Sequence, residues 1–257
     1  MNKSQLGSVE TLIDQNGIAR ITFFHPSHNA LPGNVLAKLR NAIELAGKDD
    51  AIKVIILQSS GDRTFCAGAS FDELIALNDL KTGKEFFLGF ANVINACRKC
   101  PKFIIGRVQG KAVGGGVGVA SATDYCLATK YAAVKLSELA VGIGPFVVGP
   151  AVERKMGVSA MSQLAINATE WQSAHWAMDK GLYAQVHESI EEMDEAIQTL
   201  AEKLALSNPA SMSLMKKAFW QGTEHWDELL DERAAMSGQL VLSDFTRKAI
   251  NKFKTKA

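Results

Sequence analysis

The sequence has no run of about 18 consecutive apolar residues, the length that a membrane-spanning helix needs. Residues 1–8 are polar and lack the apolar core of a secretory signal peptide. We therefore expect a cytoplasmic protein without a membrane partner.

The sequence also has almost no net charge. It contains 28 Lys and Arg against 27 Asp and Glu, which gives a formal net charge of +1. A nucleic-acid-binding protein usually carries a basic excess on one face. Basic residues gather only between residues 247 and 256, where a solvated helix face explains them better by composition. No nucleic-acid partner is expected.

Cysteine is scarce, with four residues in the chain. Cys97 and Cys100 have the CxxC spacing of a redox or zinc half-site, but no second CxxC and no histidine cluster could complete a zinc site. The remaining candidate ligands, His175, His187 and His225, have no partners at ligand spacing. We predict ordinary reduced cysteines and no metal.

The N-terminal pattern indicates strands. Residues 9–13 and 18–24 are short extended runs, and Asn16-Gly17 between them is a strong hairpin signal. The chain should therefore open with a β-hairpin.

Strand and helix patterns then alternate. Helical periodicity over residues 34–47, with Asn34 as a possible cap, precedes an apolar run at 53–58. A second helical pattern at 84–97 precedes the run at 103–108. Repeated βαβ units imply an α/β fold with parallel strands and helices outside the sheet. At 257 residues and 47% hydrophobic content, the chain can bury a large core.

From Gly149 onward the apolar pattern is helical, so we expect helices only in the last third. Asn208-Pro209 separates the α/β part from the terminal helices. The predicted helical blocks are 159–167, 172–180, 190–205, 210–220 and 224–253, the last with a break near 237–243.

The most informative motif is the triple glycine Gly114–Gly116 between a predicted strand and a predicted helix. Such a loop exposes backbone N–H groups at a helix N-terminus, where developing negative charge is stabilised. Glu138 follows in a largely apolar segment, residues 137–145. Burial there should raise the pKa of its carboxyl into the range suited to proton transfer.

The order of the motifs resembles the enoyl-CoA hydratase/isomerase (crotonase) superfamily over almost the whole chain. An apolar run leads to Ala67-Gly68-Ala69-Ser70, and a second run leads to the triple glycine. GGGVG at 114–118 and SELAVGIGP at 137–145 look most like the methylglutaconyl-CoA hydratase-like branch that lacks the first catalytic glutamate.

The resemblance implies a crotonase-like spiral of repeated ββα units. Residues 1–205 would form the α/β core, and residues 206–257 a helical extension used in trimerisation. The expected assembly is a homo-oligomer, either a trimer or a dimer of trimers.

The resemblance also assigns roles to residues. The backbone N–H groups of Ala69 and Gly115 would form an oxyanion hole for a thioester carbonyl, and Glu138 would be the acid/base group. The typical hydratase carries a first glutamate two residues after the triple glycine, where this chain has Gly118.

With one carboxylate missing, we favour hydration or dehydration of an enoyl-CoA, and branched or carboxylated acyl groups are among the candidates. Double-bond isomerisation is the alternative, and decarboxylation is a third possibility, because an oxyanion hole stabilises an enolate however it forms. A relative that binds acyl-CoA or RNA without catalysis is the competing class.

No prosthetic group is expected, since coenzyme A would enter as part of the thioester substrate. Walls of the acyl pocket are predicted within residues 71–90 and 146–152, and Ser70 is expected to cap a helix. The residues predicted to contact coenzyme A are Asn29, Ala30, Ala67, Gly68, Ala69, Gly114 and Lys254.

Overall fold

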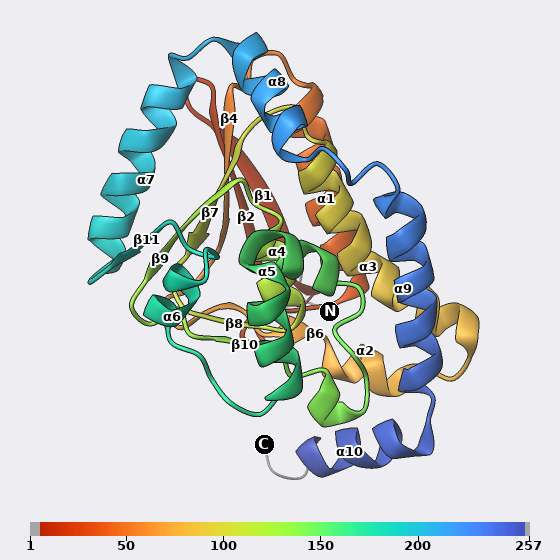
Figure 1. Ribbon diagram of the computed structural model, residues 1–257. Helices are drawn as coiled ribbons and strands as arrows, with labels where there is room; N and C mark the ends of the chain where they lie inside the picture. The colour runs from red at the N-terminus through yellow and green to blue at the C-terminus, as the bar shows by residue number, and fades with distance from the viewer. Residues whose placement is uncertain (1–5, 255–257) are drawn as a thin grey trace.

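The computed structural model describes the backbone of residues 6–254 and the side chains of residues 6–250 (Figure 1). Its largest sheet has six strands in the order β1-β2-β4-β7-β9-β11. All neighbours in it are parallel except β1 and β2. The strands are β1 (Ser8–Ile13), β2 (Ile18–Phe24), β4 (Val54–Ser59), β7 (Ile104–Val108), β9 (Tyr125–Thr129) and β11 (Gln185–His187).

The predicted hairpin is confirmed, because β1 pairs antiparallel with β2. The Asp14 carboxylate closes the turn by accepting hydrogen bonds from the backbone N–H groups of Asn16 and Ile18, both at 2.9 Å. Gly17 has φ of 81°, which a glycine adopts without the strain that a Cβ would add.

Two small sheets carry the segments that build the site. One contains β5 (Thr64–Cys66), β8 (Lys111–Val113) and β10 (Val134–Lys135), and the other pairs β3 (Ala30–Leu31) with β6 (Gly68–Ala69). Each repeat therefore adds one long strand to the large sheet, one short strand to a small sheet, and then a helix. This is the predicted spiral of ββα units.

Helices cover both faces of the large sheet (Figure 1). Side chains along β4 point alternately to the two faces of the sheet. Ile55 and Leu57 lie in the main core, and Val54 and Ile56 lie in a second hydrophobic cluster beneath α7. The helices are α1 (Gly33–Lys48), α2 (Phe71–Ala76), α3 (Leu80–Lys99), α4 (Gly115–Ser121), α5 (Gly149–Ile166), α6 (Ala174–Asp179), α7 (Ile190–Ala205), α8 (Pro209–Phe219), α9 (Trp226–Val241) and α10 (Asp244–Lys254).

Two sequence-based expectations are wrong. Asn34 does not cap α1, which begins at Gly33 after Pro32; its side-chain amide donates to the Leu6 carbonyl at 3.0 Å instead. The last third is not helices only, because β11 pairs with β9 and completes the large sheet. A strand of three residues is too short to show a periodic pattern.

The C-terminal helices pack on their own chain. α9 lies along α3, and α10 contacts both α2 and the short 3₁₀ helix η2 (Leu139–Val141). No helix in the described part of the chain is long and apolar enough to span a membrane. The role of residues 206–257 in trimerisation stays a prediction.

The α3–α9 crossing depends on two glycines. A Cβ on Gly83 would lie 2.8 Å from the Gly238 carbonyl oxygen, and a Cβ on Gly238 would lie 2.6 Å from the Lys84 backbone nitrogen. Backbone atoms cannot move aside as a side chain can, so the helices approach this closely only without side chains at these positions.

We predict that Gly238→Ala destabilises the protein by about 1–3 kcal/mol, because the added methyl overpacks the contact. Urea unfolding followed by circular dichroism measures this. Gly33→Ala is the matched control, since a Cβ there meets its nearest neighbour at an ordinary 3.6 Å. Equal stability of the two variants would contradict the proposed role of the crossing.

Candidate active site

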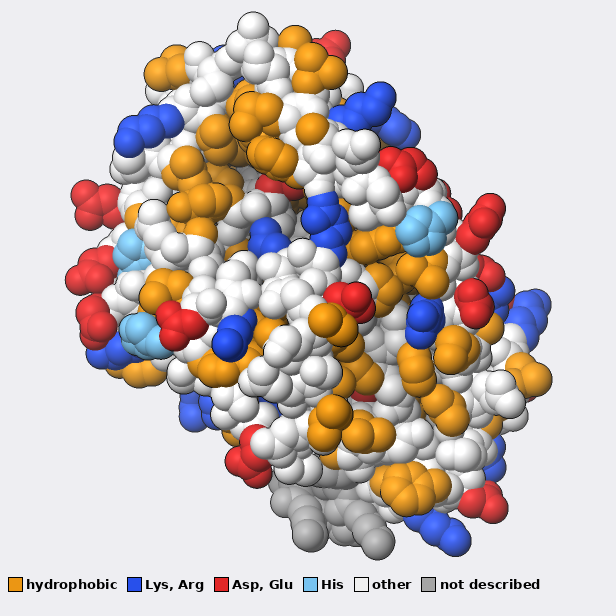
Figure 2. Space-filling model, viewed as in Figure 1, with side chains coloured by type: hydrophobic (Ala, Val, Ile, Leu, Met, Phe, Trp, Pro, Cys, Tyr) orange, Lys and Arg blue, Asp and Glu red, His pale blue; other side chains and the backbone are white. Residues whose placement is uncertain are grey.

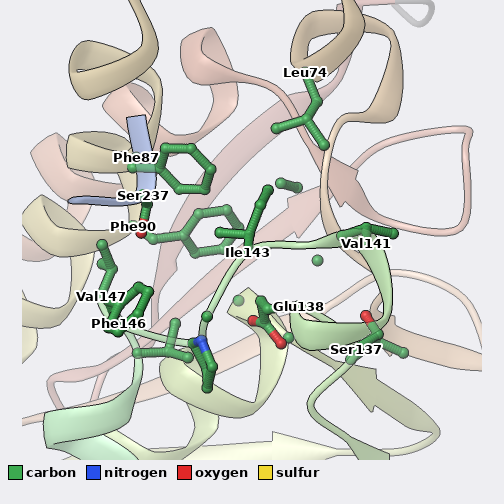
Figure 3. Close-up of a pocket in the computed structure, with 18 of the residues that line it drawn as sticks. Leu74, Phe87, Phe90, Ser137, Glu138, Val141, Ile143, Phe146, Val147 and Ser237 are labelled. Atoms are coloured by element: carbon green, nitrogen blue, oxygen red, sulfur yellow. The ribbon is translucent and has the colours of Figure 1, made fainter. Parts of the chain in front are cut away.

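A cavity of about 660 Å³, counted with its open mouth, lies between α2, α3, the start of α4 and the segment after β10 (Figure 3). Three phenylalanine rings, Phe87, Phe90 and Phe146, form much of its wall. The same cavity is lined by Ala69, Gly115 and Glu138, the three residues that the sequence predicts for the chemistry. The fold therefore brings together positions far apart in the chain.

A tight turn positions Glu138. It directly precedes η2, and its own carbonyl accepts a hydrogen bond from the Ile143 N–H at 3.0 Å. Gly142 ends η2 with φ of 80°. On the other side the carboxylate packs against Gly114, where a Cβ would lie 2.8 Å from the Glu138 Oε1. A side chain at position 114 would therefore displace the carboxylate.

The Glu138 carboxyl is poorly solvated. Its Oε2 atom is buried and has no hydrogen-bond partner among the described residues, although the residue as a whole is only half-buried. Loss of water around the charged form raises the pKa of Glu138 to about 7. This confirms the predicted direction, and it means that both protonation states are populated at neutral pH.

The two predicted oxyanion donors come from adjacent segments. Gly115 is the first residue of α4, where backbone N–H groups have no acceptor within the helix. A Cβ on Gly68 would lie 3.8 Å from the Gly115 nitrogen, so β6 runs directly beside this helix start. Gly115 itself must lack a side chain, because its Cβ would lie 2.3 Å from the Phe90 ring.

Other predicted contact residues fall into two groups. Ala67, Gly68 and Gly114 line the cavity. Asn29 and Ala30 are absent from its described lining.

Asn29 is 4% exposed, and its side-chain amide donates to the Ser60 and Thr64 carbonyls at 2.9 and 3.0 Å. These hydrogen bonds hold Asn29 against the loops that contain Ser60 and Thr64. Ala30 pairs with Gly68 in the small sheet. Their contact with coenzyme A stays a prediction, as does that of Lys254, whose side chain lies outside the described residues.

Almost the whole chain matches a known protein family. Residues 14–257 match the family model described as "Enoyl-CoA hydratase/isomerase". The chain belongs to the enoyl-CoA hydratase/isomerase family.

Its relatives in the family include hydratases and isomerases. A probable enoyl-CoA hydratase of Bacillus subtilis is 26% identical over 98% of this chain and 97% of that protein. The mouse mitochondrial methylglutaconyl-CoA hydratase is 30% identical over 76% of this chain and 63% of its own length. A peroxisomal Δ(3,5)-Δ(2,4)-dienoyl-CoA isomerase of Arabidopsis thaliana is 26% identical over 88% and 86%.

Solved structures show the same fold. The crystal structure of an enoyl-CoA hydratase from Bacillus halodurans superposes with a TM-score of 0.87 at 20% identity, over 95% of this chain and 99% of that one. The α/β spiral with a helical C-terminal region is therefore the fold of the enoyl-CoA hydratase/isomerase family.

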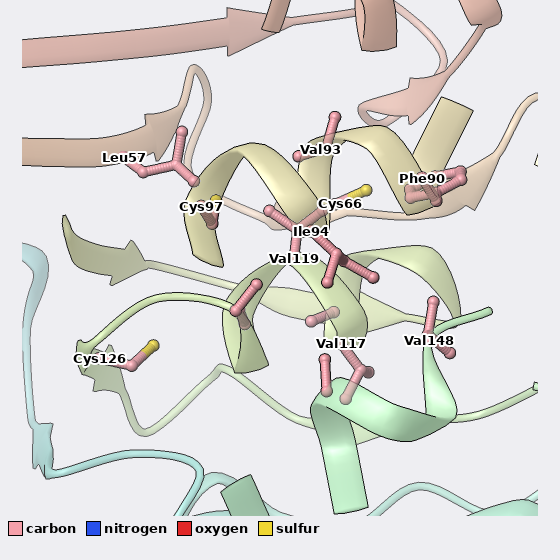
Figure 4. Close-up of a cluster of buried hydrophobic side chains, with 14 of the residues drawn as sticks. Leu57, Cys66, Phe90, Val93, Ile94, Cys97, Val117, Val119, Cys126 and Val148 are labelled. Carbon is pink, nitrogen blue, oxygen red and sulfur yellow. The ribbon is translucent and has the colours of Figure 1, made fainter. Parts of the chain in front are cut away.

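Gly118 stands where the resemblance predicts the first glutamate of a typical hydratase. A Cβ on Gly118 would lie 2.5 Å from the Val148 Cγ1 and 2.7 Å from its Cβ. Val148 and Phe90 pack against this part of α4 (Figure 4). The space that a second carboxylate would need is filled by apolar side chains.

Some residues of the cavity wall were not predicted from the sequence. The expected segments supply Phe71, Leu74, Phe146, Val147 and Val148, but Val141 and Ile143 also contribute. Ser237 lines the cavity from α9 and is 1% exposed. Nothing in the sequence marks Ser237, because its position depends on how closely α9 approaches α3.

The helix cap and the cysteines predicted from the sequence lie near the cavity and in the core. Ser70 caps α2, as predicted, by accepting a hydrogen bond from the Glu73 N–H. Cys97 and Cys100 are both buried, and neither is in a disulfide. Burial raises the pKa of the Cys97 thiol to about 12, so it is not a nucleophile at neutral pH.

The raised pKa of Glu138 predicts a pH-dependent cost in stability. Between pH 4.5 and about 7 the unfolded chain releases this proton while the folded protein keeps it, so stability falls as pH rises. Glu138→Gln cannot titrate and should become more stable than wild type by roughly 3 kcal/mol above pH 8, with little difference near pH 4. Urea unfolding across this pH range checks the prediction, with exposed Glu153→Gln as control. A pH-independent difference would contradict it.

The Val148 contact predicts strong coupling with Gly118. Gly118→Ala should destabilise the protein by about 1–3 kcal/mol, and the cost should shrink in a Val148→Gly background because the clashing atoms are gone. A double-mutant cycle by urea unfolding measures the coupling. Equal costs in both backgrounds would exclude Val148 as the group that fills this space.

Proposed function

We propose that the chain catalyses reversible hydration of an enoyl-CoA thioester with Glu138 as its single acid/base group. The observation that carries the proposal is the Glu138 carboxyl, whose buried Oε2 has no hydrogen-bond partner among the described residues and which shares a cavity with both predicted oxyanion positions. A carboxyl with a pKa of about 7 can accept and donate a proton at neutral pH.

The proposed reaction forms a C–O bond and a C–H bond, and it breaks the C=C π bond and one O–H bond of water. Water oxygen adds to the β carbon of the enoyl group while a proton is delivered to the α carbon. Glu138 takes a proton from the water through one oxygen and returns a proton to carbon through the other. Charge that develops on the thioester oxygen is stabilised by the N–H groups of Ala69 and Gly115. Coenzyme A takes part only as a portion of the substrate, and no prosthetic group is required.

Isomerisation of the double bond is the second candidate. The Gly118–Val148 contact favours it, because no second carboxylate is present at this position to hold a water molecule. Glu138 would then take a proton from one carbon and return it two carbons away. The relatives support both reactions, since hydratases and a dienoyl-CoA isomerase are comparably similar.

The cavity favours an uncharged acyl group. Glu138 is the only ionisable residue among the described residues that line it, and the remaining wall is largely apolar. A carboxylated acyl chain would lose its hydration without gaining a cationic partner there. We therefore propose an unsubstituted or branched hydrocarbon chain and not a 3-methylglutaconyl group.

A homo-oligomer, either a trimer or a dimer of trimers, is also proposed. Leu206, Leu214 and Met215 are 88%, 68% and 49% exposed at the end of α7 and along α8. A contact between subunits would cover this apolar surface.

Turnover in H₂¹⁸O tests the reaction. Wild type is incubated with crotonyl-, 3-hexenoyl- and 3-methylglutaconyl-CoA, and products are resolved by mass. We expect ¹⁸O in the acyl chain of the crotonyl product, and a loss of about 10²–10⁴-fold in kcat for Glu138→Gln. Glu153→Gln is the control for removal of an exposed carboxylate.

The other outcomes are equally informative. A shifted double bond without label would replace hydration by isomerisation. Faster turnover of 3-methylglutaconyl-CoA would contradict the uncharged acyl group. If the three thioesters bind tightly but none is converted, the proposal that the protein catalyses a reaction of these substrates is wrong.

A further inference from the structure

A second hollow lies on the far side of α4 from the Glu138 cavity, between α4, α5 and the end of α8. It encloses about 580 Å³, including its mouth. Figure 2 shows Lys and Arg side chains around a hollow between α8 and the α4–α5 region. Neither the residue roles predicted from the sequence nor the proposed reaction uses this hollow.

The acidic residue in the hollow, Asp124, is paired with a buried lysine. The Asp124 carboxylate forms an ion pair with the Lys216 ammonium at 2.8 Å. It also accepts hydrogen bonds from the Trp220 indole N–H at 3.1 Å and the Ile104 N–H at 2.8 Å. The Lys216 side chain is 2% exposed and that of Asp124 is 6% exposed. The nearest cation to Asp124 is therefore Lys216, although the Asp124 charge also acts on Arg154 and Lys155.

Two further cations in the hollow lack a carboxylate partner among the described residues. The Arg154 guanidinium lies over the Trp220 ring, 4.8 Å from its centroid. The Lys155 ammonium donates to the carbonyls of Thr123 and Asp124, at 2.9 and 3.0 Å. Burial lowers the pKa of Lys155, an effect that a bound anion would oppose.

Ser121 gives an independent indication of a ligand. It is 2% exposed, it lines the hollow, and its hydroxyl has no hydrogen-bond partner in the described part of the chain. Neighbouring Thr123 is different, because its hydroxyl donates to the Ala120 carbonyl at 2.7 Å. A buried hydroxyl without a partner is uncommon and calls for a bound group.

We propose that this hollow binds a small anion through a carboxylate or phosphate group held by Arg154, Lys155 and the Ser121 hydroxyl. Phe219 and Trp220 form an apolar wall beside it, against which a planar part of the ligand can stack. Arg154 supplies a planar fork of donors that matches either anion.

Isothermal titration calorimetry of the full chain tests the site, with inorganic phosphate and benzoate as separate probes. We expect at least one of them to bind, with affinity at least ten-fold weaker in Arg154→Gln and at least three-fold weaker in Ser121→Ala. Ser121→Ala removes no hydrogen bond of the fold, so its folding is not at risk. Tighter binding of benzoate would assign a carboxylate ligand, and tighter binding of phosphate a phosphorylated one.

Lys48→Gln is the control, since it removes an exposed cation elsewhere and should bind as wild type does. If Lys48→Gln and Arg154→Gln weaken anion binding equally, binding depends on the net charge of the protein and not on this hollow. That result would overturn the site. Binding of neither probe would also overturn it. So would a change of oligomeric state in Arg154→Gln on size exclusion without anion binding, because the hollow would then be a subunit contact.

Discussion

The structure depends on how closely other segments approach α4. All seven residues of this helix are buried, and three of them are glycines that contact neighbours where a Cβ would not fit. Gly115 lies against Phe90, Gly116 against the Cys66 carbonyl and Gly118 against Val148. Close packing of this kind fixes the helix start relative to β6, and it therefore fixes the two predicted oxyanion donors relative to each other.

The same packing determines the electrostatics of the site. Gly114 allows the Glu138 carboxylate to approach the backbone at the start of α4, and the surrounding apolar wall removes water from it. A carboxyl that costs stability when ionised is retained here at the edge of a cavity. A loss of folding stability of this kind is expected for a residue with a catalytic role, which is the role proposed for Glu138.

Much of this arrangement could be predicted from the sequence. The hairpin, the alternation of strands and helices, the glycine loop and Glu138 all have local signals in composition or spacing. The pairing of β11, the start of α1 and the position of Ser237 depend on contacts between distant segments, so no local pattern reveals them. Asn29 shows a further limit, because its motif was visible but its hydrogen bonds to Ser60 and Thr64 were not.

The turn that holds Glu138 is enclosed by the far end of the chain. A Cβ on Gly142 would lie 2.5 Å from the Phe245 ring and 2.6 Å from the Thr246 hydroxyl, both in the first turn of α10. A larger residue at position 142 would therefore need a smaller one on α10, and it would also strain the backbone, since Gly142 has φ of 80°. The turn that holds Glu138 and the C-terminal helix should vary together among homologues, although about a hundred residues separate them in the sequence.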